Sequence, residues 1–134
     1  MKEFSGRVAL VTGSTSGIGE ATARRLISLG AQVMVNSSSS VEAGQALAAE
    51  LGERAAYFQA DISSEDDCKA LVAATVEIFG GLNILVNNAG FTAVIPHEDL
   101  DAVSEEVFRR IMDVNVFGTW YLSRAAVPAL EASG

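Results

Sequence analysis

A glycine-rich segment near the N-terminus has the residue types of a phosphate-binding turn. It reads T-G-S-T-S-G-I-G over residues 12–19, with glycines at positions 13, 17 and 19. Glycines permit a tight turn, and without side chains the backbone N–H groups and a following helix N-terminus can approach a pyrophosphate closely. No Lys-Ser/Thr pair follows the last glycine, so the segment is not a P-loop. It predicts a dinucleotide-binding turn, with a purely structural turn as the alternative.

Three other polar positions could contact a ligand. Asp61 follows an apolar stretch, where it could equally cap a helix or close a turn. The residues N-N-A-G at 87–90 follow another such stretch, and their amides could simply satisfy loop backbone. Asn115 stands between two valines in an apolar helical segment, an unfavourable place that requires hydrogen-bond partners if the residue is buried. This cost makes Asn115 a candidate functional residue.

The elements that must position these residues alternate between strand and helix. Strands are predicted at residues 7–12, 32–36, 55–60 and 82–86, and helices at residues 18–29, 43–51, 64–79 and 104–128. This alternation predicts an α/β fold, a Rossmann-type doubly wound parallel sheet with helices on both faces. Right-handed crossovers then predict the strand order 3-2-1-4, with the switch point between strands one and four beside the glycine-rich turn.

Details of two helices are predicted as well. Residues 39–42, S-S-V-E, have the spacing of a capping box before the second helix. Pro128 should kink or end the last helix. The inward face of that helix is predicted from spacings of three and four residues. It consists of Val107, Ile111, Val114, Gly118, Tyr121 and Ala125.

Composition narrows the class of protein. The 134 residues, 49% of them hydrophobic, suit a single domain over residues 1–134 with a real core. A net charge of −8 argues against nucleic-acid partners and anionic membranes. Cys68 is the single cysteine, which excludes a disulfide framework and a cysteine-based metal site, so no metal is expected. The longest apolar run is short and the N-terminus has no signal-like stretch, so a cytoplasmic protein without a membrane partner is expected.

Taken together, the four motifs resemble the classical short-chain dehydrogenase/reductase family. They occur in the family's order along the whole chain: T-G-x-x-x-G-I-G at 12–19, the aspartate at 61, N-N-A-G at 87–90 and the asparagine at 115. The resemblance implies a Rossmann sheet that binds NAD(H) or NADP(H). It also implies reversible hydride transfer between nicotinamide and the carbonyl or alcohol of a small-molecule substrate.

The resemblance also implies roles for individual residues. Asp61 would accept a hydrogen bond from the adenine amino group, and the Ile62 N–H would meet the ring. Asn87 would tie strand four to its neighbours, and the main-chain carbonyl of Asn115 would hold a water in a catalytic proton relay. The phosphate-lining residues would be Gly13, Ser14, Ser16, Gly17, Ile18 and Gly19, and the ribose would pass along Asn88, Ala89 and Gly90.

The sequence departs from the family in its catalytic pair. The family uses Tyr-x-x-x-Lys, but Tyr57 is followed four residues later by Asp61, and Tyr121 by Ala125. Family members run to nearly twice this length, and the chain stops where a fifth strand should begin. We therefore expect either the cofactor-binding half of a larger enzyme or a truncated product, with the chain alone inactive. The alternatives are a catalytically silent dinucleotide-binding or scaffolding module, or a nucleotide or S-adenosylmethionine binder with another chemistry.

The cofactor preference is predicted from the end of the second strand. The strand ends at Asn36, where NAD-preferring relatives carry an acid for the ribose 2′-OH. No carboxylate stands there to repel a 2′-phosphate, and the serines Ser37 to Ser40 could donate hydrogen bonds to one, which favours NADP(H) over NAD(H). The basic residue of NADP-preferring relatives is missing too, so NAD(H) stays open. An aspartate at position 36 should shift the preference toward NAD(H). By resemblance the complete enzyme would be a homodimer or tetramer, with the last helix as a subunit contact. The aromatic residues Phe117, Trp120 and Tyr121 of that helix are most simply packing residues.

Overall fold

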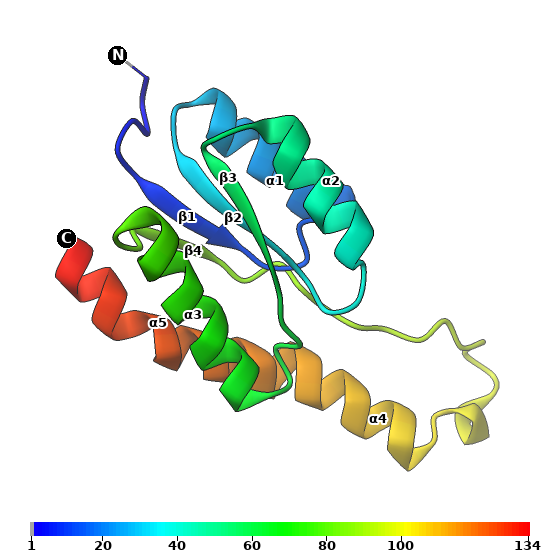
Figure 1. Cartoon of the computed structure of the whole chain (residues 1–134). Coiled ribbons are helices and arrows are strands. Elements are labelled where there is room, and N and C mark those ends of the chain that lie inside the picture. Colours follow the sequence, from blue (N-terminus) through cyan, green and yellow to red (C-terminus); the bar gives the residue numbers. More distant parts are fainter. Residues whose placement is uncertain (1) are drawn as a thin grey trace.

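The protein, described here over residues 2–134 by a computed structural model, is built on a four-stranded parallel sheet (Figure 1). The strand order is β3-β2-β1-β4, and every neighbouring pair is parallel. This order confirms the predicted Rossmann-type topology. The strands are β1 (Val8–Val11), β2 (Gln32–Ser37), β3 (Ala55–Gln59) and β4 (Ile84–Val86).

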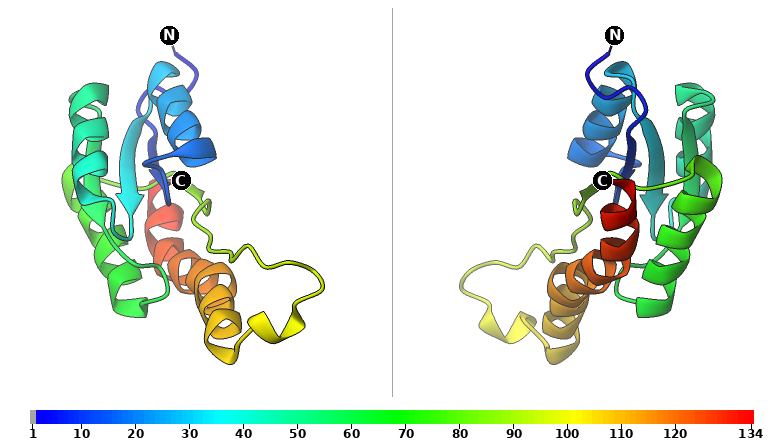
Figure 2. Two further views of the ribbon diagram at one scale, coloured as in Figure 1. Left: turned by 90° about the vertical axis from the view of Figure 1, so that its right-hand side faces the viewer. Right: turned by 90° about the vertical axis from the view of Figure 1, so that its left-hand side faces the viewer.

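Helices cover both faces of the sheet (Figures 1 and 2). On one face α1 and α2 pack against Ala9, Val11, Val33 and Val35, and on the other α3 and α5 pack against Leu10 and Met34. Neighbouring residues of each strand therefore serve opposite cores, which is the two-residue period of a strand buried on both faces. The helices are α1 (Gly17–Ser28), α2 (Val41–Leu51), α3 (Glu65–Phe79), α4 (Glu105–Met112) and α5 (Thr119–Ser133).

The capping box predicted at residues 39–42 is wrong. Helix α2 begins at Val41 with Ser40 as its N-cap, and no side chain caps it. The reason is a tight turn in which the Val41 N–H donates to the Ser39 carbonyl, so the helix begins one residue later than a box starting at Ser39 requires. Two other N-termini are capped by serine: Ser64 Oγ accepts the Asp67 N–H, and Ser104 Oγ accepts a backbone N–H of α4.

The predicted last helix is continuous but irregular. A π-helical segment, η2 (Asp113–Gly118), separates α4 from α5, and α5 continues through Pro128 to Ser133. Of the expectation that Pro128 kinks or ends the helix, the ending is therefore wrong, since packing of α5 against the sheet and α3 sustains the chain beyond it. A kink at Pro128 stays a prediction. The predicted inward residues Val114 and Gly118 are buried. Beyond the wider π turn the most buried residues are Leu122 and Ala126, while the predicted Tyr121 and Ala125 pack, partly buried, against the same core.

Two further features frame the site. The chain leaves β4 in an extended loop that projects from the body of the molecule before a short 3-10 turn, η1 (Leu100–Ala102), and α4 (Figure 2). Strand β4 is an edge strand, and its side chains are only partly buried.

In the part of the chain from residue 2 onward, no helix is long and apolar enough to cross a membrane.

Candidate functional site

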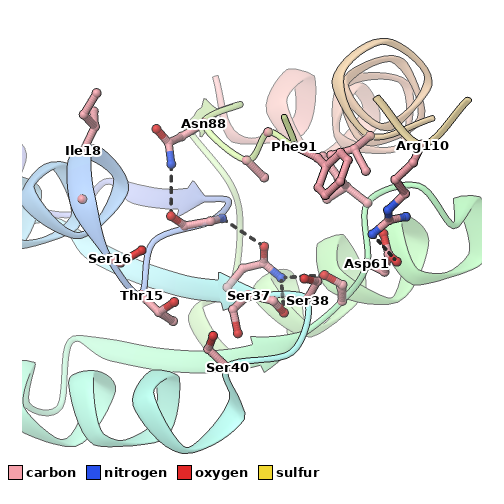
Figure 3. Close-up of a pocket in the computed structure, with 18 residues that line it drawn as sticks. Thr15, Ser16, Ile18, Ser37, Ser38, Ser40, Asp61, Asn88, Phe91 and Arg110 are labelled. Atoms are coloured by element: carbon pink, nitrogen blue, oxygen red, sulfur yellow. Dashed lines mark hydrogen bonds and ion pairs between the residues drawn. The ribbon is translucent and has the colours of Figure 1, made fainter. Parts of the chain in front are cut away.

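A cavity of about 570 Å³ opens at the carboxyl ends of the strands, beside the switch point between β1 and β4 (Figure 3). This is where open parallel sheets bind ligands. Its walls come from the glycine-rich turn, the ends of β2 and β3, the loop after β4, and α4 with the following π segment. The lining residues are Gly13, Thr15, Ser16, Gly17, Ile18, Asn36, Ser37, Ser38, Ser40, Ala60, Asp61, Ile62, Asn88, Ala89, Gly90, Phe91, Arg110 and Val114.

The glycines of the turn have different structural roles. Gly13 and Gly17 adopt φ values of 58° and 57°, in the left-handed region that side chains disfavour. A Cβ on Gly17 would meet no protein atom within 4 Å, so the space beside it is open. A Cβ on Gly19 would lie 2.3 Å from the Gly13 carbonyl oxygen, so Gly19 allows α1 to pack against the turn. The turn thus places the first residues of α1 against the cavity.

The N-terminus of α1 is suited to bind an anion. Ser16 is the N-cap residue and makes no side-chain capping hydrogen bond. The first N–H groups of a helix have no partner within the helix, and they carry the positive end of its dipole. Ser16, Gly17 and Ile18 line the cavity, and Ile18 is largely exposed there. The arrangement can hold a phosphate group without a basic side chain.

Ser14 does not line the cavity, and its hydroxyl is used inside the protein. Ser14 is fully buried, and its Oγ donates to the Val11 carbonyl at 2.6 Å and accepts the Asn36 N–H at 3.0 Å. Gly19 is likewise absent from the lining. Their predicted contact with phosphate stays a prediction, and the observed geometry gives both residues a part in shaping the turn.

Asn36 reaches the cavity wall but its side chain is occupied by protein partners. Its Nδ2 donates to the carbonyls of Phe58 at 3.1 Å and Ala60 at 3.3 Å, and its Oδ1 accepts the Gly13 N–H at 3.3 Å. Asn36 is 1% exposed. The expected effect of an aspartate at position 36 on cofactor preference stays a prediction, and a carboxylate there would face the carbonyl oxygens that the Asn36 amide now contacts. Ser37 is also buried and shares a 2.6 Å hydrogen bond with the Tyr57 hydroxyl.

The residues after β4 are joined to the glycine-rich turn. Asn88 Nδ2 donates to the carbonyls of Thr12 at 3.0 Å and Gly13 at 3.1 Å. The backbone N–H groups of Asn88 and Ala89 both donate to Thr12 Oγ1. Asn88, Ala89 and Gly90 line the cavity as the predicted ribose contacts would, which stays a prediction. These contacts fix the floor of the cavity at the switch point.

Asn87 points elsewhere. Its Nδ2 donates to Ser123 Oγ at 3.1 Å, which ties the exit of β4 to α5. The role expected for Asn87, which ties strand four to its neighbours, stays a prediction.

Asp61 lies at the opposite end of the cavity from α1 (Figure 3). Its Oδ1 accepts both the N–H and the hydroxyl of Ser63, at 3.0 and 2.7 Å, and its Oδ2 pairs with Arg110 at 3.4 Å. Burial opposes ionisation, but the Ser63 hydrogen bonds and the Arg110 charge outweigh it and lower the pKa of Asp61. Asp61 is therefore a carboxylate at neutral pH. The neighbouring Ile62 is buried and also lines the cavity.

Asn115 lies in the π-helical segment and borders an adjoining cavity of about 440 Å³. Its Oδ1 accepts the Phe91 N–H at 2.8 Å and its Nδ2 donates to the Phe91 carbonyl at 2.9 Å. Its main-chain carbonyl accepts from Thr119 Oγ1 at 3.2 Å. The two cavities share Ala89, Gly90 and Phe91. A π turn often marks a functional position in a helix.

Several lining residues were not predicted from the sequence. They are Thr15, Ala60, Phe91, Arg110 and Val114. Thr15 belongs to the glycine-rich turn that was expected at the cavity, whereas Ser38 and Ser40 belong to the serine run expected to contact a 2′-phosphate. Arg110 is one of an adjacent basic pair, and only the fold brings it to Asp61. Within residues 2–134, no cluster of three or more His, Cys, Asp or Glu side chains is placed to bind a metal ion.

Comparison with known proteins gives consistent matches. A family model described as short chain dehydrogenase matches residues 7–134. "Granaticin polyketide synthase putative ketoacyl reductase 2" of Streptomyces violaceoruber is 53% identical over 127 residues, which are 95% of this chain and 51% of that protein. A 2,5-dichloro-2,5-cyclohexadiene-1,4-diol dehydrogenase of Sphingobium indicum is 44% identical over 135 residues, covering 100% of this chain and 52% of that protein.

Solved structures give the same picture. The crystal structure of 3-ketoacyl-(acyl-carrier-protein) reductase from Brucella melitensis complexed with NADH is 37% identical, with a TM-score of 0.91. The match covers 98% of this chain and 52% of that one. The chain thus spans about half the length of the curated relatives and solved structures it matches.

Proposed function

Because the chain belongs to the short-chain dehydrogenase family, we propose that it forms the dinucleotide-binding part of an NAD(P)-dependent oxidoreductase. The reaction would be hydride transfer between nicotinamide and the carbonyl or alcohol of a small molecule. The observation that carries the proposal is the cavity at the switch point, with the uncapped N-terminus of α1 on one side and the Asp61 carboxylate on the other.

The residues present fit a dinucleotide. Backbone N–H groups at Ser16, Gly17 and Ile18 would hold the pyrophosphate, with open space beside Gly17 for its approach. The Asp61 carboxylate would accept from the adenine amino group at the far end of the cavity. When bound, the nicotinamide supplies or accepts the hydride. Gly90, whose backbone lines both cavities, would border the passage between the cofactor and the adjoining space.

Asn115 is proposed to position the substrate side of the site. Its side chain holds the Phe91 backbone through two hydrogen bonds, and its main-chain carbonyl accepts from Thr119 Oγ1, a residue that lines the adjoining cavity. We propose that a water molecule binds at this carbonyl. Such a water could move a proton, which is the relay role the resemblance implies for Asn115.

A preference for NADP(H) over NAD(H) stays our proposal. The lining beside the end of β2 carries hydroxyl and amide groups without a carboxylate. Since Asn36 and Ser37 are occupied, the side chains available to a 2′-phosphate are those of Thr15, Ser38 and Ser40. Hydroxyl donors favour a phosphate, and a carboxylate would repel it.

Titration of the purified chain with NADPH and NADH tests the proposal. Binding of either, with NADPH tighter, is expected, together with no turnover of a ketone. No Tyr-x-x-x-Lys pair occurs in the 134 residues to supply the acid. Absence of binding would refute the proposal, and ketone turnover by the chain alone would refute the assignment of roles.

The second candidate function is a catalytically silent dinucleotide-binding or scaffolding module, favoured by the same missing pair. The mass of the protein purified from its native source separates the two. A product larger than this chain that reduces a carbonyl supports the oxidoreductase. A product of this mass that binds NADPH without turnover supports the silent module.

We propose a homo-oligomer, dimer or tetramer, for the complete enzyme in the cytoplasm. Phe108 of α4, Phe117 and Trp120 are 59%, 46% and 57% exposed. The expectation that Phe117 and Trp120 pack inside this chain is therefore wrong, because the π segment and α5 turn them outward. Large apolar side chains exposed on consecutive helical segments favour a subunit contact. Light scattering on the complete enzyme tests the oligomer, and a monomer would refute it.

A further inference from the structure

Arg110 forms a closed ring of hydrogen bonds with Ser63 and Asp61. Its NH1 donates to Ser63 Oγ at 3.0 Å, and its NH2 donates to Asp61 Oδ2 at 3.4 Å. Ser63 Oγ in turn donates to Asp61 Oδ1 at 2.7 Å. Two different nitrogens of the planar guanidinium are used, so the ring fixes the direction of the carboxylate as well as its charge.

The hydrogen-bonded ring leaves one acceptor position of the Asp61 carboxylate free. A carboxylate has about two acceptor positions on each oxygen. Both positions of Asp61 Oδ1 are taken, by the N–H and the hydroxyl of Ser63. Oδ2 has one partner, Arg110, so one acceptor position remains on that oxygen. Asp61 lines the cavity, so a ligand with an N–H donor can reach this position.

The Arg110 guanidinium is itself held on its other side. Its central carbon lies 5.8 Å from the centre of the Phe91 ring, a cation–π contact. The Phe91 backbone is fastened by both groups of the Asn115 amide, at 2.8 and 2.9 Å. The loop after β3 and the loop after β4 are therefore joined through Arg110 at the same end of the cavity (Figure 3).

We propose that Arg110 is a positioning residue for the base of the dinucleotide, holding Asp61 so that its single free acceptor position selects an exocyclic amino group. This inference rests on the proposed function. Adenine carries such an amino group, and hypoxanthine carries a carbonyl oxygen at that position. A fixed carboxylate therefore binds adenine and repels hypoxanthine, whereas a carboxylate free to rotate into solvent discriminates less.

The test compares NADH with reduced nicotinamide hypoxanthine dinucleotide, which differ at that position of the base. The purified chain is titrated with each and the ratio of the two Kd values is the readout. The wild-type ratio should favour NADH about tenfold, the size expected for one charge-assisted hydrogen bond at a half-exposed site. In Arg110→Gln the ratio should fall to about threefold or less, because the charge and the fork that orient Asp61 are lost.

Matched variants keep the result interpretable. Arg109→Gln removes the same charge from the neighbouring residue, which pairs with Glu105 on the outer face of α4, and it should keep the tenfold ratio. Arg110→Met retains an unbranched stem against Phe91 and should lose discrimination as Arg110→Gln does. A general loosening of the fold would weaken both nucleotides together and leave the ratio unchanged.

The outcomes separate the two proposals. If the wild-type chain binds neither nucleotide, the proposed function fails, and this inference fails with it. If it binds both but without base preference, or if both Arg110 variants keep the tenfold ratio, the dinucleotide site stands and the role of Arg110 is overturned.

Discussion

The substitution Asn36→Asp tests whether the Asn36 side chain holds the strand ends together or contacts a ligand. The Asn36 amide donates to the carbonyls of Phe58, Ala60 and Ser37, at 3.1, 3.3 and 3.4 Å, while its oxygen accepts the N–H of Gly13. A carboxylate keeps the acceptor but loses all three donations, and it faces these carbonyl oxygens at full charge. A buried carbonyl left without a donor costs about 1–3 kcal/mol, and a buried charge adds to this. We expect Asn36→Asp to lose about 4 kcal/mol of unfolding free energy at pH 7.

Urea unfolding measures this loss. For a chain of this size, with m of about 2 kcal/mol per molar urea, a loss of about 4 kcal/mol moves the midpoint by about 2 M. Asn36→Ala is the matched control, because it removes the amide without adding charge, and it should lose only about half as much. Ser38→Asp is the second control. It places the same carboxylate on an exposed lining residue two positions along, so the fold should survive.

The pH dependence gives a second signature of the same cause. Burial among acceptors raises the pKa of an aspartate at position 36 above its unfolded value of about 3.9. The folded variant then binds a proton more readily than the unfolded chain, so its stability relative to wild type rises as the pH falls. The deficit should therefore shrink between pH 7 and about 5. An Asn36→Asp chain as stable as wild type at pH 7, or a deficit independent of pH, would refute this account.

Three shorter predictions concern other contacts. Gly19→Ala should lose about 3 kcal/mol of unfolding free energy in urea, because its Cβ would lie 2.3 Å from a backbone oxygen. Gly17→Ala should lose only about 1 kcal/mol, from backbone strain, but it should weaken NADPH binding in titrations. Equal stability of the two variants would contradict this prediction. Thr12→Val should lose about 2 kcal/mol in the same unfolding assay, because its hydroxyl accepts two backbone N–H groups from the exit of β4, and an unchanged midpoint would count against that role. Burial and the nearby acidic side chains raise the pKa of the Cys68 thiol to about 11. Iodoacetamide at pH 8 should therefore label Cys68 only when the chain unfolds locally or globally. Fast labelling of the folded protein would contradict this prediction.

The topology could be predicted from the sequence because it rests on local patterns that agree with one another. Stretches such as Val8–Val11 are apolar at every position, which indicates a strand buried on both faces. Each is followed by a helical segment, and right-handed crossovers leave few arrangements. The glycine-rich turn then falls at the switch point without further assumption. Strand and helix bounds differ from the prediction mainly by one or two residues at their ends.

The rest depends on contacts between segments distant in sequence. Arg110 and Asp61 are 49 residues apart, and no local pattern distinguishes Arg110 from the exposed Arg109 beside it. The π-helical segment could not be predicted from the sequence either, because Asp113–Gly118 fits the period of a regular α-helix. Only the packing of α5 against α3 determines which of its residues face inward. The turn before α2 rests on a single backbone contact, in which the Val41 N–H donates to the Ser39 carbonyl.

The polar residues at the switch point show why residues that bind a ligand are hard to distinguish by sequence from residues that hold the strand ends together. Thr12, Ser14, Asn36 and Asn88 all hydrogen-bond across the ends of β1, β2 and β4. In residues 2–134, every buried side-chain nitrogen or oxygen has a partner, so this network is complete without a ligand. Its effect is to hold the backbone of the glycine-rich turn in one conformation before any phosphate arrives, which lowers the cost of binding. Substitutions in the network should therefore lower the stability of the fold and weaken binding as a consequence. Substitutions of Gly17 and Ser38, which line the cavity, should act mainly on affinity, with about 1 kcal/mol of backbone strain added at Gly17.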